Sequence, residues 1–275
     1  MVKSITKKKE EGEIIETLPK QSIILKGNKS SPVISALLPE LNKLRSPSSA
    51  LFSKKHNEAR PFENPENFQK FLSQNHVCLF ALGSNSKKRP NNLIIGRTYE
   101  EELLDIVEFE VEDFTSANQF KVPIELGVKP LFLFQGDLFE TDSIYTRIKN
   151  LFLDFFSGRP IDKVDARGCE QLIAISATQD GKIYFKQYHI ARTEPRLQEA
   201  GPSIVFKLRR HKLADESKFK QACKEPKLRK KVKNITTNTL KEKRGQLHVQ
   251  QQDIKTIALK KRNLKHKKKE EKTNE

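Results

Sequence analysis

The chain has 275 residues, 36% of them hydrophobic and 32% charged, so it can form a hydrophobic core while much of its length stays in water. Its net charge of +17 is uneven: residues 218–275 contain 20 Lys or Arg against 6 Asp or Glu, whereas residues 1–217 contain 32 against 29. Three distant cysteines, no apolar leader and no membrane-length apolar run argue against a disulfide scaffold, a secreted protein and a membrane protein. We therefore expect an intracellular protein without a membrane partner, in which a nearly neutral body carries a basic tail.

The first part of the chain alternates between apolar runs and amphipathic stretches. Ser31 followed by Pro32 is typical of a helix start, because a hydroxyl caps free N–H groups and proline fits the first turn. Apolar side chains then recur at three- and four-residue spacing as far as Leu44, and Pro39 is expected to kink this helix. In order, the sequence predicts a strand at 22–26, a helix at 31–45, a strand at 50–52, a basic loop at 53–61, a helix at 62–73, and strands at 77–82, 93–95 and 102–114.

The second part of the chain carries similar signals. Thr141-Asp142 is typical of a helix cap and precedes an apolar stripe, and Asp180-Gly181 is a hairpin signal. Residues 203–210 alternate as a strand does, with Ile204, Phe206 and Leu208 on one face. The elements predicted are a strand at 131–134, a helix at 142–156, strands at 172–177 and 182–190, a turn at 199–202, a strand at 203–210 and a helix at 217–224.

Both parts follow the order strand, glycine, capped helix, strand, so residues 22–52 can be laid over residues 130–177. Strands that alternate with helices predict a mixed α/β (α+β) layered fold rather than an all-β one. We predict a charged extension at 1–20, a domain at 20–226 with similar halves at about 20–115 and 128–226, and a basic, largely disordered or helical tail at 227–275.

One loop stands out, Gly83-Ser84-Asn85-Ser86-Lys87-Lys88-Arg89-Pro90-Asn91-Asn92, which is held between two apolar runs. Three successive cations and two side-chain amides on a hydrophobic scaffold suit a polyanion, since Lys and Arg neutralise phosphates and Asn reaches sugars or base edges. The alternative interpretation is a solvated hairpin loop, because turns are polar in any case.

Signals for catalysis or metal binding are weak. Gly27-Asn28-Lys29-Ser30 lacks the glycine spacing and the Gly-Lys pair of a phosphate loop, and the six histidines form no metal-ligand pattern. The carboxylates between Asp105 and Asp113 suit acid–base chemistry, but acidic residues that alternate with apolar ones are more simply a solvated strand face. The sequence therefore predicts no catalytic residue, no metal site and no cofactor, and a protein that is not an enzyme.

Several of these segments, in this order, resemble the Brix-domain family. They are Leu51–Lys55 with Arg60-Pro61-Phe62, Gly83–Thr98, Lys129-Pro130 with Leu133–Glu140, and Glu199–Pro202 with Leu208–Arg210. The resemblance covers approximately residues 20–235 and implies a domain of two similar α/β halves, in agreement with the suggested duplication. The N-terminal extension and the tail lie outside it.

The resemblance also implies a function, because the Ser-Lys-Lys-Arg-Pro-Asn-Asn block distinguishes one branch of the family. Its members are assembly factors of the large ribosomal subunit that act in the nucleolus and pair with a regulator-of-ribosome-synthesis protein. The two proteins bring 5S rRNA and the two 5S rRNA-binding ribosomal proteins into the precursor particle. They also support maturation of the large-subunit precursor rRNA.

The expected role is to position RNA and a protein partner without chemistry. Tyr184 and Tyr188 share a strand face, where we expect packing under a helix rather than base stacking. Alternation places Arg209 and Arg210 on opposite strand faces. The predicted RNA-binding residues are Lys54, Lys55, Arg60, Lys87, Lys88, Arg89 and Arg97 at phosphates, Asn91 and Asn92 at sugars or bases, and Arg209, Arg210, Lys212, Lys227, Arg229, Lys230 and Lys231 beside them.

Two alternatives stay open at this point. The body is either an RNA-binding surface or a protein-interaction platform whose RNA contact is limited to the tail. The tail itself suits RNA binding, a nucleolar address signal, or both, because a block of like charge serves either role.

Overall fold

The computed structural model describes residues 20–56, 60–122, 125, 127–157, 168–191, 196–224, 234–240, 242–245 and 247. Contacts divide the chain into two units, Glu16–Pro226 and a second that combines Met1–Ile15 with Lys227–Glu275. Within the second unit the structure describes a two-stranded antiparallel ribbon, β10 (Ile235–Thr237) with β11 (Lys243–Gly245). That ribbon was not predicted from the composition of the tail.

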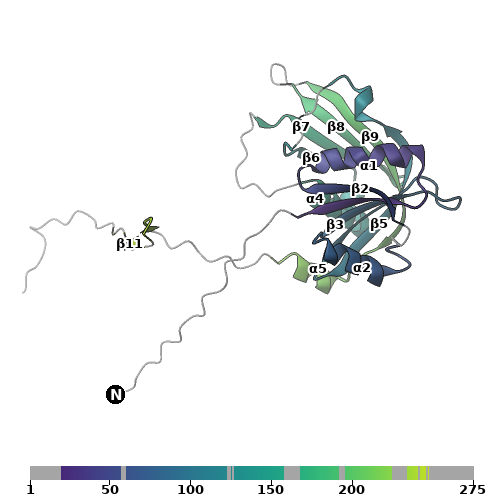
Figure 1. The fold of residues 1–275 in the computed structure, drawn as a ribbon. Coiled ribbons are helices and arrows are strands. Elements are labelled where there is room, and N and C mark those ends of the chain that lie inside the picture. The colour runs from purple at the N-terminus through teal and green to yellow at the C-terminus, as the bar shows by residue number, and fades with distance from the viewer. Residues whose placement is uncertain are drawn as a thin grey trace, which may run out of the picture. The chain divides into compact units, whose positions relative to one another are not determined.

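The unit 16–226 is built on one nine-stranded sheet with the order β2-β1-β3-β4-β5-β9-β8-β7-β6 (Figure 1). The strands are β1 (Ser22–Gly27), β2 (Ser49–His56), β3 (Leu79–Ser84), β4 (Asn92–Tyr99), β5 (Glu102–Thr115), β6 (Leu131–Gln135), β7 (Gln171–Ala177), β8 (Lys182–Ile190) and β9 (Leu197–Lys212). The helices are α1 (Pro32–Arg45), α2 (Pro65–Gln74), α3 (Leu138–Thr141), α4 (Ser143–Phe156) and α5 (Glu216–Ala222), with a 3-10 turn η1 (Ala117–Gln119). The mixed α/β fold predicted from the sequence is confirmed.

Two similar halves meet in the middle of this sheet. In the first half β1 pairs parallel with β3, and β3, β4 and β5 then pair antiparallel with one another in sequence order. In the second half β6 pairs parallel with β7, and β7, β8 and β9 likewise pair antiparallel in sequence order. The halves join through the antiparallel pair β5–β9. β7 therefore corresponds to β3, not to β2 as the overlay of residues 22–52 on 130–177 implied. β2 and α2 are an addition to the first half, and β2 pairs along the outer edge of β1.

One face of the sheet is covered by α1 and α4, which share a single core with strands of both halves (Figure 1). The predicted caps are present, since the Ser31 hydroxyl accepts a hydrogen bond from Ile34 N (3.2 Å) and the Asp142 carboxylate accepts one from Ile144 N (2.8 Å). α1 continues through Pro39 as one helix. The other face is covered by α2 only over β1, β3, β4 and β5, where Phe68 and Leu72 form a second, smaller core.

Several local predictions differ from the structure. Residues 53–56, expected in a loop, extend β2, and residues 199–202, expected to form a turn, lie within β9. The acidic stretch is not a solvated strand face, because β5 lies in the middle of the sheet and buries Asp105 and Glu108 completely. Among the described helices none covers Tyr184 and Tyr188, which are half-buried on an open face of β8.

Candidate nucleic-acid interface

The cationic loop is a hydrogen-bonded turn between β3 and β4. Ser86 N donates to Arg89 O (3.0 Å) and Arg89 N donates to Ser86 O (3.1 Å), while Asn91 N donates to the Asn85 side-chain oxygen (3.1 Å). Asn85 N in turn donates to Lys29 O (2.7 Å), which ties this turn to the loop after β1. Lys87 and Lys88 are exposed at the tip and have no ion pair within the described part of the chain.

Beneath this turn lies a cavity of about 450 Å³ at the carboxyl ends of the parallel strands β1 and β3. Loops at the carboxyl ends of parallel strands are a common position for ligand sites in α/β sheets. Among the described residues, four cationic side chains line the cavity, Lys29, Arg60, Arg89 and Arg210, together with two carboxylates, Glu63 and Glu108. Asn28, Ser84, Asn85 and Ser86 add hydrogen-bonding groups, so the cavity has both positive charge and polar donors.

Arg89 and Arg210 share the two carboxylates. Arg210 NH2 lies 3.0 Å from Glu63 Oε1, and Arg210 Nε also pairs with Glu108, while Arg89 NH1 lies 3.6 Å from Glu63 and 3.5 Å from Glu108. The Arg210 guanidinium also lies over the Phe62 ring, 3.9 Å from its centroid. Partial burial acts to raise the pKa of Glu63, but the hydrogen bond and charge of Arg210, helped by Arg89, hold that pKa below its ordinary value.

Arg209 and Arg210 reach the same sheet face, contrary to the alternation argument. A β-bulge pairs Glu108 with Arg210 and Phe109 with Leu208, which leaves Arg209 as the extra residue. Arg209 consequently pairs with Glu110 (2.9 Å), which lies on the same face of β5 as Glu108. Its NH1 group also donates to the Asn92 side-chain oxygen (3.2 Å).

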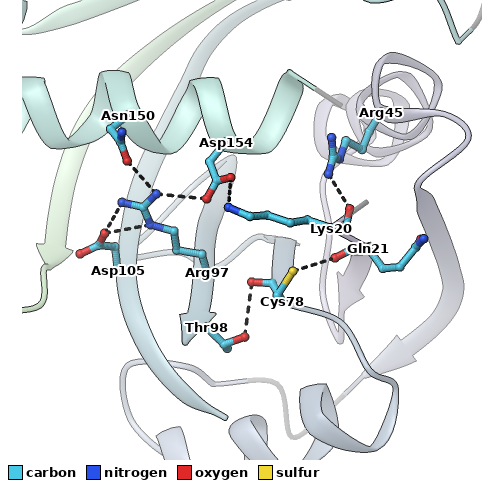
Figure 2. Close-up of polar contacts among 9 residues, drawn as sticks. All are labelled: Lys20, Gln21, Arg45, Cys78, Arg97, Thr98, Asp105, Asn150 and Asp154. Carbon is cyan, nitrogen blue, oxygen red and sulfur yellow. Dashed lines mark hydrogen bonds and ion pairs between the residues drawn. The ribbon is translucent and has the colours of Figure 1, made fainter. Parts of the chain in front are cut away.

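Two predicted site residues are enclosed by the fold. Asn92 lines the cavity but is almost completely buried, and both ends of its amide are already bonded: the nitrogen donates to the Ser84 hydroxyl (3.3 Å) and the oxygen accepts from Arg209. Arg97 is buried in a polar network between β4 and α4 (Figure 2), where its Nε and NH2 groups donate to Asp105 Oδ2 at 2.9 and 2.6 Å. Its NH1 group donates to Asn150 (2.8 Å) and Asp154 (3.1 Å). We therefore leave Asn92 and Arg97 out of the interface proposed below.

The remaining predicted residues are dispersed. Arg60 lines the cavity, and Asn91 lies at the base of the turn with φ 44°. Lys54 on β2 and Lys212 at the end of β9 are exposed but do not line the cavity. The side chain of Lys55 and residues Lys227, Arg229, Lys230 and Lys231 lie outside the described residues.

Sequence reasoning missed Lys29 and Glu63 as site residues. Lys29 follows the Gly27-Asn28 turn at the end of β1, and a basic residue after a strand-ending glycine was the available signal. Glu63 had no such signal, because its role depends on Arg89 and Arg210 from distant segments. Within the described residues, no cluster of His, Cys, Asp or Glu suits a metal ion, and no helix is long and apolar enough to cross a membrane.

Comparison with known proteins places this geometry in a family. The Brix domain model matches residues 27–210. "Ribosome production factor 2 homolog" of Schizosaccharomyces pombe is 34% identical over 262 residues, which cover 88% of this chain and 82% of that protein. The human protein of the same name is 37% identical over 231 residues, which cover 80% and 74%. A probable ribosomal biogenesis protein from Aeropyrum pernix K1 is a structural neighbour with a TM-score of 0.46 and 12% identity, covering 68% of this chain and 96% of its own. The family model spans both halves of the sheet, and the chain accordingly belongs to the Brix-domain family, among the ribosome production factor 2 homologues.

Proposed function

We propose that this protein is a non-enzymatic assembly factor of the large ribosomal subunit that binds rRNA through the turn 85–91 and the cavity beneath it. In this role it acts in the nucleolus and helps to bring the 5S ribonucleoprotein, 5S rRNA with its two ribosomal proteins, into the precursor particle. It pairs there with a regulator-of-ribosome-synthesis protein and supports maturation of large-subunit rRNA. The names of its relatives support the coarser role, a ribosome production factor.

One observation supports RNA binding by the body: Lys87 and Lys88 are exposed on a hydrogen-bonded turn and have no ion pair with any described residue, and described cationic side chains line the cavity beside them. Cations fixed in this way neutralise phosphates without the entropy cost of ordering a free loop. The amide of Asn28 and the hydroxyls of Ser84 and Ser86 add groups that can bond sugar hydroxyls or base edges.

Salt-dependent RNA binding tests the proposal. In the full chain, Lys87→Ala/Lys88→Ala should lower affinity for large-subunit rRNA fragments and reduce the slope of log K against log salt by about 1.5, since two counterion-releasing contacts are lost. The matched control is Lys220→Ala on α5, whose side chain is 70% exposed. Helix α5 lies near the start of β5, at the opposite end of that strand from the turn 85–91, so this variant should leave the slope unchanged. An unaltered slope in the double variant would remove this turn from the site.

The alternative is a body that binds proteins only, with RNA contact limited to the tail. Residues 16–226 form one unit by themselves, so a chain ending at Pro226 distinguishes the two. If the body binds RNA, the truncated chain keeps salt-sensitive binding that still depends on Lys87 and Lys88. If only the tail binds, truncation abolishes it.

A further inference from the structure

The cavity beneath the turn 85–91 contains a buried carboxylate oxygen that has no hydrogen-bond donor within the described part of the chain. Glu108 of β5 lines the cavity, and its side chain is 0% exposed. Arg210 Nε donates to Glu108 Oε2, whereas Oε1 accepts no hydrogen bond from any residue that the structure describes. Arg89 NH1 lies 3.5 Å from Oε1 and contributes charge without a hydrogen bond. Because a buried acceptor without a donor costs free energy, Oε1 favours a ligand that brings N–H groups.

Apolar side chains lie beside this carboxylate on the same face of the sheet. The strand registers pair Leu82 of β3 with Ile94 of β4, and Ile94 with Glu108. Directly opposed residues of antiparallel strands share a face, so the two aliphatic side chains and the carboxylate form a row, and all three line the cavity. Its volume of about 450 Å³ lies within the ~300–1,000 Å³ range of small-molecule sites. A flat ring can therefore lie against Leu82 and Ile94 with its edge toward Glu108.

The charges around the cavity indicate that the ligand as a whole is anionic. Lysines and arginines outnumber carboxylates among the described residues here. The cations are Lys29, Arg60, Arg89 and Arg210 in the lining and Lys87 and Lys88 on the turn, and the carboxylates are Glu63 and Glu108. A basic side chain of a protein would bring N–H groups to Glu108, but these cations would repel it. A nucleotide combines the required features, because it carries a phosphate, a flat ring and, on some bases, an edge with N–H donors.

We propose that the cavity binds one unpaired guanine of RNA, with the guanine N1–H and N2–H groups donating to the Glu108 carboxylate. Guanine has two adjacent donors on that edge. Adenine and cytosine have a ring-nitrogen acceptor next to their amino group, and uracil has its N–H between two carbonyl oxygens, so each would place an acceptor against the carboxylate. Bases of single-stranded RNA are recognised on this edge when they are splayed out. The inference rests on the proposed RNA-binding function and adds base selectivity to it.

Entry of the base requires the Arg89 side chain to move. Arg89 NH1 lies 3.6 Å from Glu63 and 3.5 Å from Glu108, and its side chain is 41% exposed. A phosphate next to the guanine offers Arg89 a stronger, charge-assisted partner, and the movement uncovers Glu108 Oε1 for the base. Arg210, which bonds both carboxylates and lies over the Phe62 ring, stays in place. Glu108 therefore keeps one arginine while it accepts the guanine.

Fluorescence anisotropy on the full chain tests the base selectivity. Each probe is a labelled oligouridine of about ten nucleotides, a usual length for single-strand sites, with guanosine, inosine, adenosine, cytidine or uridine at its centre. Affinities are compared at raised salt, which weakens sequence-independent phosphate contacts. The guanosine probe should bind about fivefold or more tighter than the adenosine, cytidine and uridine probes, and inosine, which lacks the N2 amino group, should fall between. Equal affinities, tighter binding of another base, or no measurable binding would overturn the guanine site.

A matched pair of carboxylate variants assigns the selectivity to Glu108. Glu108→Gln removes an acceptor and should lose most of the guanine preference while it keeps the salt slope. Glu110→Gln is the control and should keep the preference, because Glu110 also lies on β5 and pairs with an arginine of β9 but does not line the cavity. A Glu108→Gln variant that is folded by circular dichroism and still prefers guanosine would refute the proposal. If that variant does not fold, the probe series on the native chain decides.

Failure of this inference is distinguishable from failure of the proposed function. Lys87→Ala/Lys88→Ala should lower the salt slope and keep the ratio of guanosine to inosine affinity. A lowered slope without any base preference in the native chain would retain the phosphate-binding turn and remove the guanine site. An unaltered slope together with a guanine preference that depends on Glu108 would retain the guanine site and remove the turn.

Discussion

At the scale of single residues, charge pairing decides which cations are available to a partner. Arg97 and Arg209 are as basic in the sequence as Lys87 and Lys88, yet both are occupied by carboxylates of β5. Arg89 and Arg210 are intermediate in their availability to a partner. Glu63 and Glu108 pair with them, yet both arginines still line the cavity. The exposed Glu63 is therefore a competitor of any phosphate that enters the cavity.

Removing that competitor should tighten RNA binding. The lowered pKa of Glu63 means that its carboxylate is charged at pH 7, and its ion pairs are lost only as pH falls through that lowered value. Glu63→Gln should raise RNA affinity two- to fivefold, roughly the strength of an exposed ion pair. Fluorescence anisotropy at fixed salt measures this, with Glu66→Gln on the first turn of α2 as the control. Weaker binding by Glu63→Gln would contradict the assignment of the cavity.

Arg97 is predicted to stabilise the fold rather than to bind RNA. Among the described residues, Arg97→Ala leaves the completely buried Asp105 with only the Ala214 N–H (3.0 Å) and a distant Arg147 (3.9 Å), so we expect a loss of about 3–5 kcal/mol in unfolding free energy. Urea denaturation measures it. Arg97→Lys should lose less, because it retains the charge but not the paired hydrogen bonds. A change in RNA salt slope without a change in stability would argue for a direct contact instead.

At the scale of elements, small backbone features place the site. The bulge in β9 turns Arg209 and Arg210 toward one face, and the paired hydrogen bonds of Ser86 and Arg89 shape the turn that presents the lysines. β3 must also approach α1 closely, because a Cβ at Gly83 would lie 2.4 Å from Ile34 Cγ2. The position of this turn therefore depends on how tightly α1 packs on β3.

Gly83→Ala tests that dependence. Ile34 is completely buried and β-branched, so it cannot move aside, and the overpacking should cost about 1–3 kcal/mol of unfolding free energy. Gly168→Ala is the matched control, since a Cβ there meets nothing within 4 Å. Thermal unfolding by circular dichroism compares the two. Equal stability of both variants would show that α1 can shift away from β3 at little cost, contrary to this prediction.

At the scale of the whole molecule, the sheet makes the two halves depend on each other. Buried Asp105 and Glu108 belong to β5 of the first half, but each also bonds a group from the end of the second half, Ala214 N–H for Asp105 and Arg210 for Glu108. The largest core likewise combines α1 of the first half with α4 of the second. Gene duplication would account for the similar halves, but the shared core predicts that neither half is stable by itself.

A chain of residues 20–115 alone should therefore not fold cooperatively. It would expose β5 as an edge strand, remove the Ala214 N–H from Asp105 and Arg210 from Glu108, and uncover the part of the shared core that α4 covers. Circular dichroism and urea titration would show no two-state transition, whereas residues 16–226 should give coincident transitions by fluorescence and circular dichroism. A sigmoidal transition of the fragment would disprove this interdependence.

The features that could be predicted from the sequence depend on contacts between residues close together in the chain, and the features that could not be predicted depend on contacts between residues far apart in the chain. Local patterns predicted most elements correctly: the cap at Ser31, the hairpin at Asp180-Gly181 and the apolar run of β3 depend only on neighbours in the chain. The same patterns identified the lysines of the turn 85–91. They could not reveal that β5 lies in the middle of the sheet, so the acidic stretch was predicted to be a solvated strand face. The glycine–proline segment of β9 was likewise predicted to be a turn.

By itself, the sequence determined the mixed α/β class, the family and the basic character of one loop, because each is carried by residues adjacent in the chain. Only the tertiary structure decided which cations are neutralised, which polar side chains are buried, and which apolar face of the sheet is open. Those outcomes depend on pairs such as Arg210 with Glu63 and Arg97 with Asp154, which are far apart in sequence and meet only when β5 and β9 join the halves. Electrostatic and burial energies depend on distance in space, and the amino-acid order does not specify that distance until the sheet is assembled.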